Sequence, residues 1–574
     1  MYYKTLVKIP TKNSKVTMNK RGNTTYIEYT YDRKYNAEKK YNVPLRTTIG
    51  KMSAEDKKMM YPNPNFEKYF PTVVLPECDD SSFRSSCVKV GAYIVIKKIA
   101  KDYKLSSHLE SWDERGKGLL LDLASYSIIT ESNVYQHYPE YAYNHPLLTP
   151  KHKIYSDSTI SRFLSEIEFD QRLDFLNSWN EKRNHNDKIY ISYDSTNKSC
   201  KAGDIEKVEY GHPKNDVGAP ILNYSIAYDM NNQVPLLYET YPGSIIDVSQ
   251  LKYLIDKIQG FGYKNLGFVL DRGYFSKANI NHLRDCKFDY VIMVKGMASF
   301  VHNQIEENKG KFELKRANLI SEYSTYGMTI ESKLYEDDTK NSYFHLFFKD
   351  ERRNAEIREL ENRLRLMAST MDECKGKAVT LPKAYYHYYD LVFNAVNGVE
   401  KFFGYKEKAD VVERELNLCG YFAIVTSAKM TAQEALRLYK NRDESEKLFL
   451  SDKSFLGSNS LRVSNNNSLE AKIFIEFIAL IIRNKIYTYL KKRLAELPKR
   501  PNYMSVPTAI KELEKIEIIR QPKGHYKLDH AITAKQKVIL GAFGLDEKAV
   551  INEAVKIGKE LEKSSLPEKE TDDE

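Results

Sequence analysis

The sequence lacks the features of membrane proteins and of disulfide-bonded secreted proteins. Its longest apolar run, Ile473–Ile482, is broken by Glu476, so it is too short to span a bilayer and predicts a buried helix. No apolar signal region opens the sequence, which favours a cytoplasmic protein without membrane attachment. The 6 cysteines are scattered with no C-x-x-C pair, which argues against a zinc site or a disulfide framework. Membrane channels, collagen and small disulfide scaffolds are excluded.

What is present is a globular composition with an uneven charge. Hydrophobic residues make up 42% and charged residues 29% of the 574 residues, a length that suggests about four domains. Residues 1–70 hold 15 basic and 6 acidic residues, whereas residues 559–574 hold 3 basic and 7 acidic ones. A basic arm on a nearly neutral body indicates a polyanionic partner, most simply nucleic acid. By charge alone, a solvated lysine-rich face explains the arm equally well.

The first two regions differ in their patterning. Residues 1–80 mix short alternating runs such as TTYIEYTYD with turn signals such as YPNPN, which predicts a basic, β-rich N-terminal region. Residues 81–186 predict helices, and we interpret them as a helical DNA-binding region. One helix is expected over Asp157–Leu176, with Asp157 or Ser158 as its N-cap.

Residues 187–296 alternate strands and helices in the order β-β-β-α-β-α-β, which indicates a mixed α/β unit. KIYISYD is an apolar strand ending in Asp194, and LGFVLD is another ending in Asp271. ILNYSIAYD and VPLLYET, joined by MNNQ, predict an antiparallel hairpin. The spacing of leucine and isoleucine predicts a helix over Asp247–Ile258, with Asp247 as a candidate N-cap.

The rest of the chain divides into three further regions. Residues 297–430 contain β-like runs and one amphipathic helix around Glu351–Met367, and we interpret them as a β-rich insertion domain. In residues 431–495 a helix should begin at Thr431, which has capping-box spacing to Glu434, and a second long helix follows. Residues 496–574 predict a helical C-terminal region with an acidic tail.

The residue types at the two strand ends suggest metal chemistry. Ligands bind at strand ends in α/β sheets, and two carboxylates in one sheet could share a divalent cation such as Mg²⁺. A two-metal site needs a third carboxylate. With 100° per residue, one face of the helix from Thr431 carries Tyr439, Arg442, Glu446 and Lys453 within about 60°. A charged stripe of this kind is also typical of an ordinary solvated helix face.

These residues carry a family resemblance. The stretch YKNRDESEKLFLSDK has the pattern Tyr-x2-Arg-x3-Glu-x6-Lys, and in this it resembles the DDE transposases of insertion-sequence family four. YDST at the first aspartate and LDRGYFS at the second are similar to motifs of that family. GHPKND and PLLYETYPGSIIDVSQL are similar to its subgroup with a long N-terminal region. The resemblance covers about residues 85–490.

The resemblance implies a ribonuclease-H-like (retroviral-integrase-like) catalytic core with a β-rich insertion before a late catalytic helix. It implies that Asp194, Asp271 and Glu446 form the catalytic, metal-binding triad for two Mg²⁺ or Mn²⁺ ions. The gap between Asp271 and Glu446 is long enough for such an insertion. Tyr439, Arg442 and Lys453 would hold DNA near the cleaved phosphate.

One feature of some family members is missing here. They stack a flipped base on a tryptophan in the insertion, but the only tryptophans of this chain are Trp112 and Trp179. Tyr421 or Phe422 could take that role.

The sequence therefore predicts a transposase that cleaves transposon ends and transfers the 3′ hydroxyl end to target DNA. The implied partners are double-stranded DNA, both terminal repeats and target, and a second copy of the chain in a synaptic complex at the bacterial nucleoid. A structure-specific two-metal nuclease would explain the carboxylates but not the Tyr-Arg-Glu-Lys pattern. A non-enzymatic DNA-binding descendant of a transposase would not need an intact triad.

Overall fold

The fold was analysed in a computed structural model of the whole chain. The structure describes residues 6–11, 15–22, 24–36, 40–53, 56–71, 73, 84–202, 205–211, 218–294, 298–396, 398–443, 447, 456, 460–463, 465–521 and 525–564. Within these ranges, no helix combines the length and the apolar character that crossing a membrane requires.

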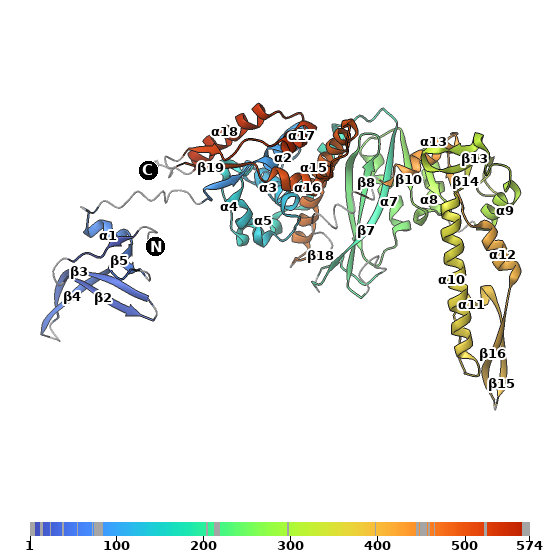
Figure 1. The fold of residues 1–574 in the computed structure, drawn as a ribbon, viewed down its shortest axis with the longest axis horizontal. Coiled ribbons are helices and arrows are strands. Elements are labelled where there is room, and N and C mark those ends of the chain that lie inside the picture. The colour runs from blue at the N-terminus through green and yellow to red at the C-terminus, as the bar shows by residue number, and fades with distance from the viewer. Residues whose placement is uncertain are drawn as a thin grey trace.

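The N-terminal region forms a small antiparallel sheet. Its strand order is β1-β5-β4-β3-β2, and a short helix, α1, follows the last strand (Figure 1). The elements are β1 (Val7–Lys8), β2 (Val16–Arg21), β3 (Thr24–Asn36), β4 (Tyr41–Met52), β5 (Met59–Pro62) and α1 (Pro64–Tyr69). Ile27, Ile49, Met60 and Phe66 are buried together, so this unit has a hydrophobic core of its own.

A mixed sheet forms the centre of the molecule. Strand β7 pairs in parallel with β10 and antiparallel with β8, and the order β11-β10-β7-β8-β9 makes up one half of the sheet. The elements are β7 (Ile189–Cys200), β8 (Ile221–Asp229), β9 (Val234–Pro242), α7 (Asp247–Gly260), β10 (Leu266–Leu270), α8 (Lys277–Asp285) and β11 (Asp289–Met293). The expected order β-β-β-α-β-α-β and the β8–β9 hairpin are confirmed.

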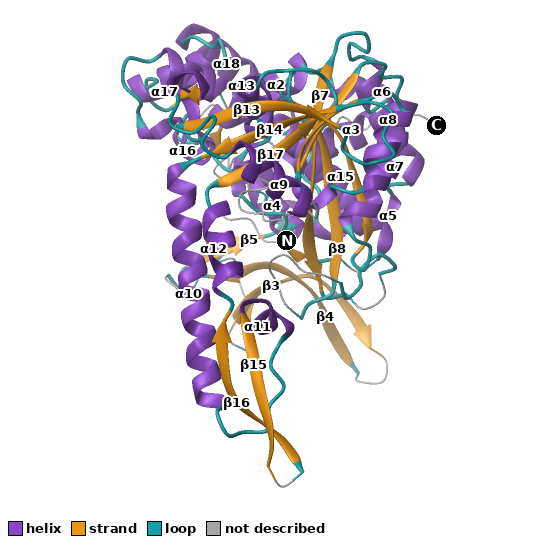
Figure 2. Cartoon of the chain, turned by 90° about the vertical axis from the view of Figure 1, so that its right-hand side faces the viewer, coloured by secondary structure: helices purple, strands orange, loops and turns teal. Residues whose placement is uncertain are grey.

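Residues 297–430, expected to be a β-rich insertion, divide into strands that join the central sheet and an arm that projects from it. Strands β12 (Leu319–Ile320), β13 (Thr325–Ser332), β14 (Ser342–Phe348) and β17 (Tyr421–Thr426) continue the central sheet, because β17 pairs with β11. The remainder forms an arm that projects from the sheet, visible on the right of Figure 1 and at the lower left of Figure 2. The arm consists of α10 (Asp350–Cys374), α11 (Lys383–Tyr388) and the hairpin β15 (Tyr389–Val396) and β16 (Val399–Glu407); α9 (Ala298–Asn308) and α12 (Ala409–Leu418) lie near its base.

This segment holds more helix than we expected. The amphipathic helix predicted around Glu351–Met367 is present as α10, which is 25 residues long and buries Leu360, Leu364 and Met367 against the hairpin. Helices α9, α11 and α12 add to it, so helices and strands alternate through the segment.

Helices from both ends of the sequence form one body. The N-terminal group is α2 (Gly91–Asp102), α3 (Glu114–Thr130), α4 (Tyr138–Asn144), α5 (Asp157–Glu166) and α6 (Phe169–Glu181). The C-terminal group is α15 (Asn466–Glu496), α16 (Val506–Leu513), α17 (Ala534–Ala542) and α18 (Glu547–Ser564). A three-stranded sheet of order β20-β19-β6 joins them, with β6 (Cys87–Lys89), β19 (Glu517–Arg520) and β20 (Tyr526–Leu528). The apolar run Ile473–Ile482 is a buried part of α15, as predicted.

Some local predictions were wrong. The helix expected over Asp157–Leu176 is two helices, α5 and α6, because buried Ile167 is extended and Glu168 starts a new capping box. The cap of α5 is Ser156, not Asp157 or Ser158, and its hydroxyl accepts from the backbone N–H of Thr159.

Two aspartates also lie differently from the prediction. Helix α7 begins at Asp247 with Ile246 as the N-cap, and the Asp247 carboxylate instead accepts a hydrogen bond from the Tyr241 hydroxyl. Asp194 is not at a strand end, because β8 pairs with β7 from Ile191 through Ser199 and carries the strand on to Cys200.

Candidate active site

Asp194 and Asp271 meet at the centre of the mixed sheet. Parallel pairing of β10 with β7 places Leu270 beside Tyr193, so the next residues on the two strands, Asp271 and Asp194, are neighbours. Tyr193 and Leu270 belong to the main core on one face of the sheet. Because side chains alternate along a strand, both aspartates point to the opposite face. Their side chains are 22% and 39% exposed, which leaves carboxylate oxygens accessible.

Helix α13 (Ala432–Lys440) covers that opposite face. Its N-terminus is the predicted capping box, in which the Thr431 hydroxyl accepts from the Glu434 backbone N–H while the Glu434 carboxylate accepts from the Thr431 N–H. Leu436 and Tyr439 are buried with Val269 of β10. The local sequence thus sets where α13 begins, and its apolar face fixes the helix on the sheet beside the aspartates.

Tyr439 and Arg442 both reach the aspartates. The Tyr439 hydroxyl donates a hydrogen bond to Asp271 Oδ1 at 3.2 Å. Arg442 lies just after α13, with Nη1 3.9 Å from Asp194 Oδ2 and Nη2 4.0 Å from Asp271 Oδ1. Its guanidinium carbon is 5.4 Å from the centre of the Tyr439 ring. One guanidinium therefore lies within 4.0 Å of both carboxylates, and its charge offsets their mutual repulsion.

Sequence reasoning did not single out two residues that hold the first aspartate. The Ser195 backbone N–H donates to Asp194 Oδ1 at 2.8 Å, and the Tyr274 hydroxyl donates to Ser195 Oγ at 2.9 Å. Burial above all, helped by nearby acidic groups, raises the pKa of Tyr274 well above its usual value, so its hydroxyl keeps its proton. The motif LDRGYFS contains this tyrosine three residues after Asp271. Its position in that motif was the signal that could have identified it.

The other predicted site residues are not placed. Glu446 and Lys453 lie outside the described residues, so their roles stay predictions. Helix α13 ends at Lys440, whereas the angular argument for Glu446 assumed an unbroken helix through Arg442. Asp443, the neighbouring acid, is described and exposed.

The aromatic residues considered for base stacking are engaged in the sheet. Tyr421 is buried, lies 4.8 Å from the Phe348 ring and hydrogen-bonds Glu313. Phe422 stacks on Phe347 at 5.0 Å, with Arg352 over its ring. Tyr421 is therefore unsuited to receive a flipped base, because its ring is already packed in the core.

The aspartate pair fits a hard divalent cation. Carboxylate oxygens are the donors that Mg²⁺ and Mn²⁺ prefer, and both carboxylates are partly open to solvent. A second cluster, Asp256, His282 and Cys286, brings ligand atoms within 4.8 Å of one another on α7 and α8. That cluster offers mixed oxygen, nitrogen and sulfur donors, which suit a softer ion than Mg²⁺. The hard-ion site is thus the aspartate pair.

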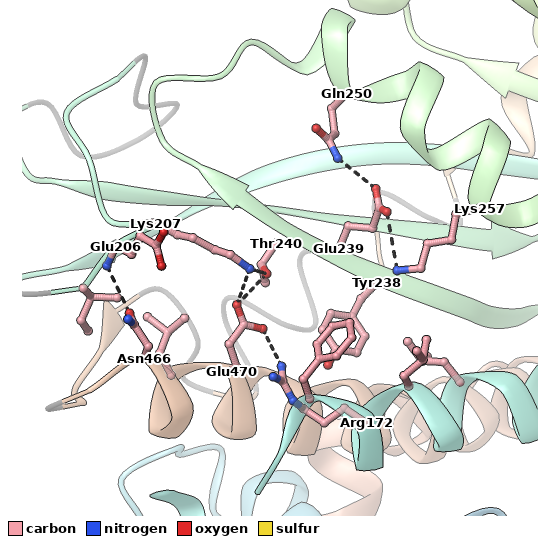
Figure 3. Close-up of a pocket in the computed structure, with 15 residues that line it drawn as sticks. Arg172, Glu206, Lys207, Tyr238, Glu239, Thr240, Gln250, Lys257, Asn466 and Glu470 are labelled. Atoms are coloured by element: carbon pink, nitrogen blue, oxygen red, sulfur yellow. Dashed lines mark hydrogen bonds and ion pairs between the residues drawn. The ribbon is translucent and has the colours of Figure 1, made fainter.

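The pocket shown in Figure 3 is a different feature. It has a volume of about 300 Å³ and lies between α6, β9 and α15, away from the aspartates. Glu470 accepts from Arg172 at 2.8 Å, from Lys207 at 2.7 Å and from Thr240 at 2.8 Å. Burial opposes the ionised form of Glu470, but Lys207 and Arg172 outweigh it and lower the pKa. Glu470 of α15 thus joins α6 and β9 through Arg172 and Thr240, and both cations beside it are paired.

Comparison with known proteins agrees with this geometry. A family model described as "Transposase DDE domain" matches residues 187–482. No curated protein matches the chain. Among solved structures, the chain is similar to a piggyBac transposase in a synaptic complex with hairpin DNA, at 10% identity and a TM-score of 0.30, over 62% of this chain and 59% of that one. A similarity of that size carries no argument. The family match spans more than half of the residues and includes both aspartates and α13, so the chain belongs to the transposase DDE domain family.

Proposed function

We propose that this protein is a DNA transposase of insertion-sequence family four, which cleaves transposon ends and joins the 3′ hydroxyl to target DNA. The observation that carries the proposal is the convergence of Asp194, Asp271, Tyr439 and Arg442 at one place on the sheet. These four come from segments up to 248 positions apart in sequence, and three of the family's motifs supply them. Family membership supports an enzyme that acts on DNA.

The fold supports a ribonuclease-H-like core. Three antiparallel strands are followed by two parallel ones. Asp194 lies on β7, and Asp271 directly follows the adjacent parallel strand β10. The late helix α13 packs beside these strands, where the family's third carboxylate is expected. We assign that carboxylate to Glu446, with Lys453 and Arg442 as contacts to DNA phosphates.

The described residues suggest how the site works. Asp194 and Asp271 would hold two Mg²⁺ or Mn²⁺ ions together with Glu446. When bound, such ions activate an attacking hydroxyl and stabilise the leaving 3′ oxygen. Tyr439 keeps Asp271 oriented through its hydrogen bond, and Ser195 does the same for Asp194. Arg442 provides a fork of donors suited to a phosphate. Water and a 3′ hydroxyl react by the same in-line displacement, so one site serves both cleavage and strand transfer.

Two copies of the chain are expected in the active complex, because two transposon ends must be brought together before joining. The partners proposed are therefore double-stranded DNA, both terminal repeats and target, and a second copy of the chain. This part of the proposal follows from the reaction and not from a contact in the structure.

The decisive experiment is a strand-transfer assay with Mg²⁺ on DNA carrying the ends of the element that encodes the chain. We expect Asp194→Asn and Asp271→Asn to abolish cleavage while retaining fold and DNA binding, because crowded carboxylates repel and neither is needed for the core. Asp256→Asn, an exposed aspartate on α7, is the matched control and should cleave normally. Mg²⁺-dependent cleavage by either site variant would remove that residue from the site; cleavage by the wild type without joining would favour a nuclease.

A further inference from the structure

A two-stranded ribbon extends from the N-terminal sheet. Strand β2 pairs with β3 only as far as Tyr29, and β5 pairs with β4 only at Gly50–Met52. Beyond these limits, β3 residues Asp32–Asn36 are paired with β4 residues Tyr41–Leu45. Figures 1 and 2 show β3 and β4 running side by side as the longest strands of this sheet. We call residues 31–36 and 41–46 the β3–β4 ribbon.

Both faces of the ribbon are open to solvent. All five residues from Tyr31 to Tyr35 are exposed, although side chains of neighbouring residues point to opposite faces. Tyr35 is 62% and Tyr41 56% exposed. A two-stranded ribbon is marginally stable by itself in water, and these two tyrosines leave more than half of their surface exposed. The composition therefore suits contact with a partner.

The charge of the ribbon identifies the kind of partner. Its twelve residues hold three basic residues, Arg33, Lys34 and Arg46, and one acidic residue, Asp32, a net charge of +2. At the other end of the same sheet, by contrast, Arg21 is neutralised by Glu28 at 2.8 Å. An excess of positive charge with interspersed aromatic rings fits a polyanion, and the major groove of B-DNA admits a two-stranded β-ribbon.

The strand register sorts the side chains into two sets. Arg33 lies opposite Pro44 and Tyr35 opposite Asn42, so Arg33, Tyr35 and Asn42 share one face. Lys34 lies opposite Val43 on the other face. Arginine pairs with guanine and asparagine with adenine through two hydrogen bonds each, whereas lysine contacts phosphates without reading sequence.

We propose that the β3–β4 ribbon enters the major groove of the transposon-end DNA, with Arg33 and Asn42 reading base edges and Lys34 contacting the phosphate backbone. This inference rests on the proposed function, because it takes double-stranded DNA as the substrate. It assigns recognition of the end to the N-terminal sheet and leaves the chemistry to the aspartates of the central sheet.

The test uses the full chain and compares duplex DNA from the element's end with a scrambled duplex of equal length. Arg33→Ala and Asn42→Ala should each weaken binding to end DNA roughly tenfold, with little change for scrambled DNA. Lys34→Ala should weaken both by a similar factor and reduce the slope of log K against log salt by about 0.9. Lys57→Ala removes the same charge from an exposed turn of the same region outside the ribbon, and should bind as the wild type does.

The outcomes separate this inference from the proposed function. If the wild type cleaves end DNA while Arg33→Ala and Asn42→Ala bind it with wild-type affinity and discrimination, the ribbon is not the reader and the function stands. If the ribbon variants change the oligomeric state and leave DNA affinity unaltered, the ribbon binds a second copy of the chain, and the inference is overturned. Failure of the wild type to bind end DNA would overturn both.

Discussion

Removing one partner of the buried Lys198–Glu476 pair should strongly destabilise the protein. Lys198 lies on β7, four residues after Asp194, and Glu476 lies within α15. The Nζ–Oε2 distance is 3.2 Å and both side chains are 0% exposed. Asn133 donates to the other oxygen of Glu476 at 3.0 Å, and Lys198 Nζ lies 4.5 Å from the centre of the Tyr224 ring. The pair thus ties β7 to α15.

The expected magnitude follows from complete burial. A single replacement, Lys198→Met or Glu476→Leu, breaks a fully buried ion pair and should cost about 3–5 kcal/mol. That is a large share of the roughly 5–15 kcal/mol by which domains are stable. The double variant removes both charges and should cost much less than the sum, because apolar side chains of similar volume replace a buried ion pair at little cost.

The assay is urea unfolding of the four proteins of this double-mutant cycle, followed by tryptophan fluorescence. Trp112 stacks on Phe474 of α15 at 5.7 Å and Trp179 lies in the same core, so the signal reports the part of the molecule that contains the pair. The matched control is the exposed Arg493–Glu496 pair of the same helix, whose loss should cost at most about 0.5 kcal/mol.

The reasoning would be refuted if either single variant lost less than about 1 kcal/mol, or if the two losses simply added in the double variant. Either result would mean that the charges are not energetically coupled in the core.

Three further predictions concern the active site and the central sheet. Arg442→Ala should abolish strand transfer with little loss of stability, and Arg442→Lys should restore it only in part because lysine lacks the planar fork; wild-type activity of Arg442→Ala would leave the guanidinium without a role. Glu446→Gln should lose cleavage while Asp443→Asn keeps it, and the reverse result would move the third carboxylate to Asp443. Burial lowers the pKa of His345 from 6.5 to about 4. As the pH falls below 6.5, this histidine is therefore protonated in the unfolded chain before it is protonated in the folded protein. About 3 kcal/mol of stability, fully present above pH 6.5, should be lost as the pH falls towards 4, and denaturation curves of His345→Gln should show a flatter pH dependence; equal slopes would contradict this.

Much of the local structure could be read from the sequence because its causes are local. The Thr431–Glu434 capping box, the β8–β9 hairpin and the apolar face of α10 each depend on residues within a few positions of one another. Errors arose where one local pattern is compatible with two structures, such as one long helix or two shorter ones. The apolar periodicity of 157–176 does not mark the break, which comes from the extended, buried Ile167 and from the capping box of Glu168 with Gln171.

The candidate site divides in the same way. The pattern Tyr-x2-Arg and the two aspartate motifs identified Asp194, Asp271, Tyr439 and Arg442 as a set before any fold was known. The sequence did not reveal that Ser195 and Tyr274 support Asp194. The contact between Tyr274 and Ser195 exists because the turn after β10 packs beside β7 in the folded chain.

By itself, the sequence predicted many of the element types and the order of the α/β core, and it suggested residues to bind a metal and phosphate. Only the tertiary structure decided that β7 runs past Asp194, that β17 extends the central sheet and that β19 pairs with β6 across more than four hundred residues. Strand pairing joins backbone N–H and C=O groups that lie far apart along the chain. These groups are the same in nearly every residue, so the side chains do not reveal which strands pair. Local periodicity therefore predicts a strand but not its neighbour. Strand pairing makes the two aspartates neighbours, and the packing of α13 on the sheet brings Arg442 within 4.0 Å of both carboxylates.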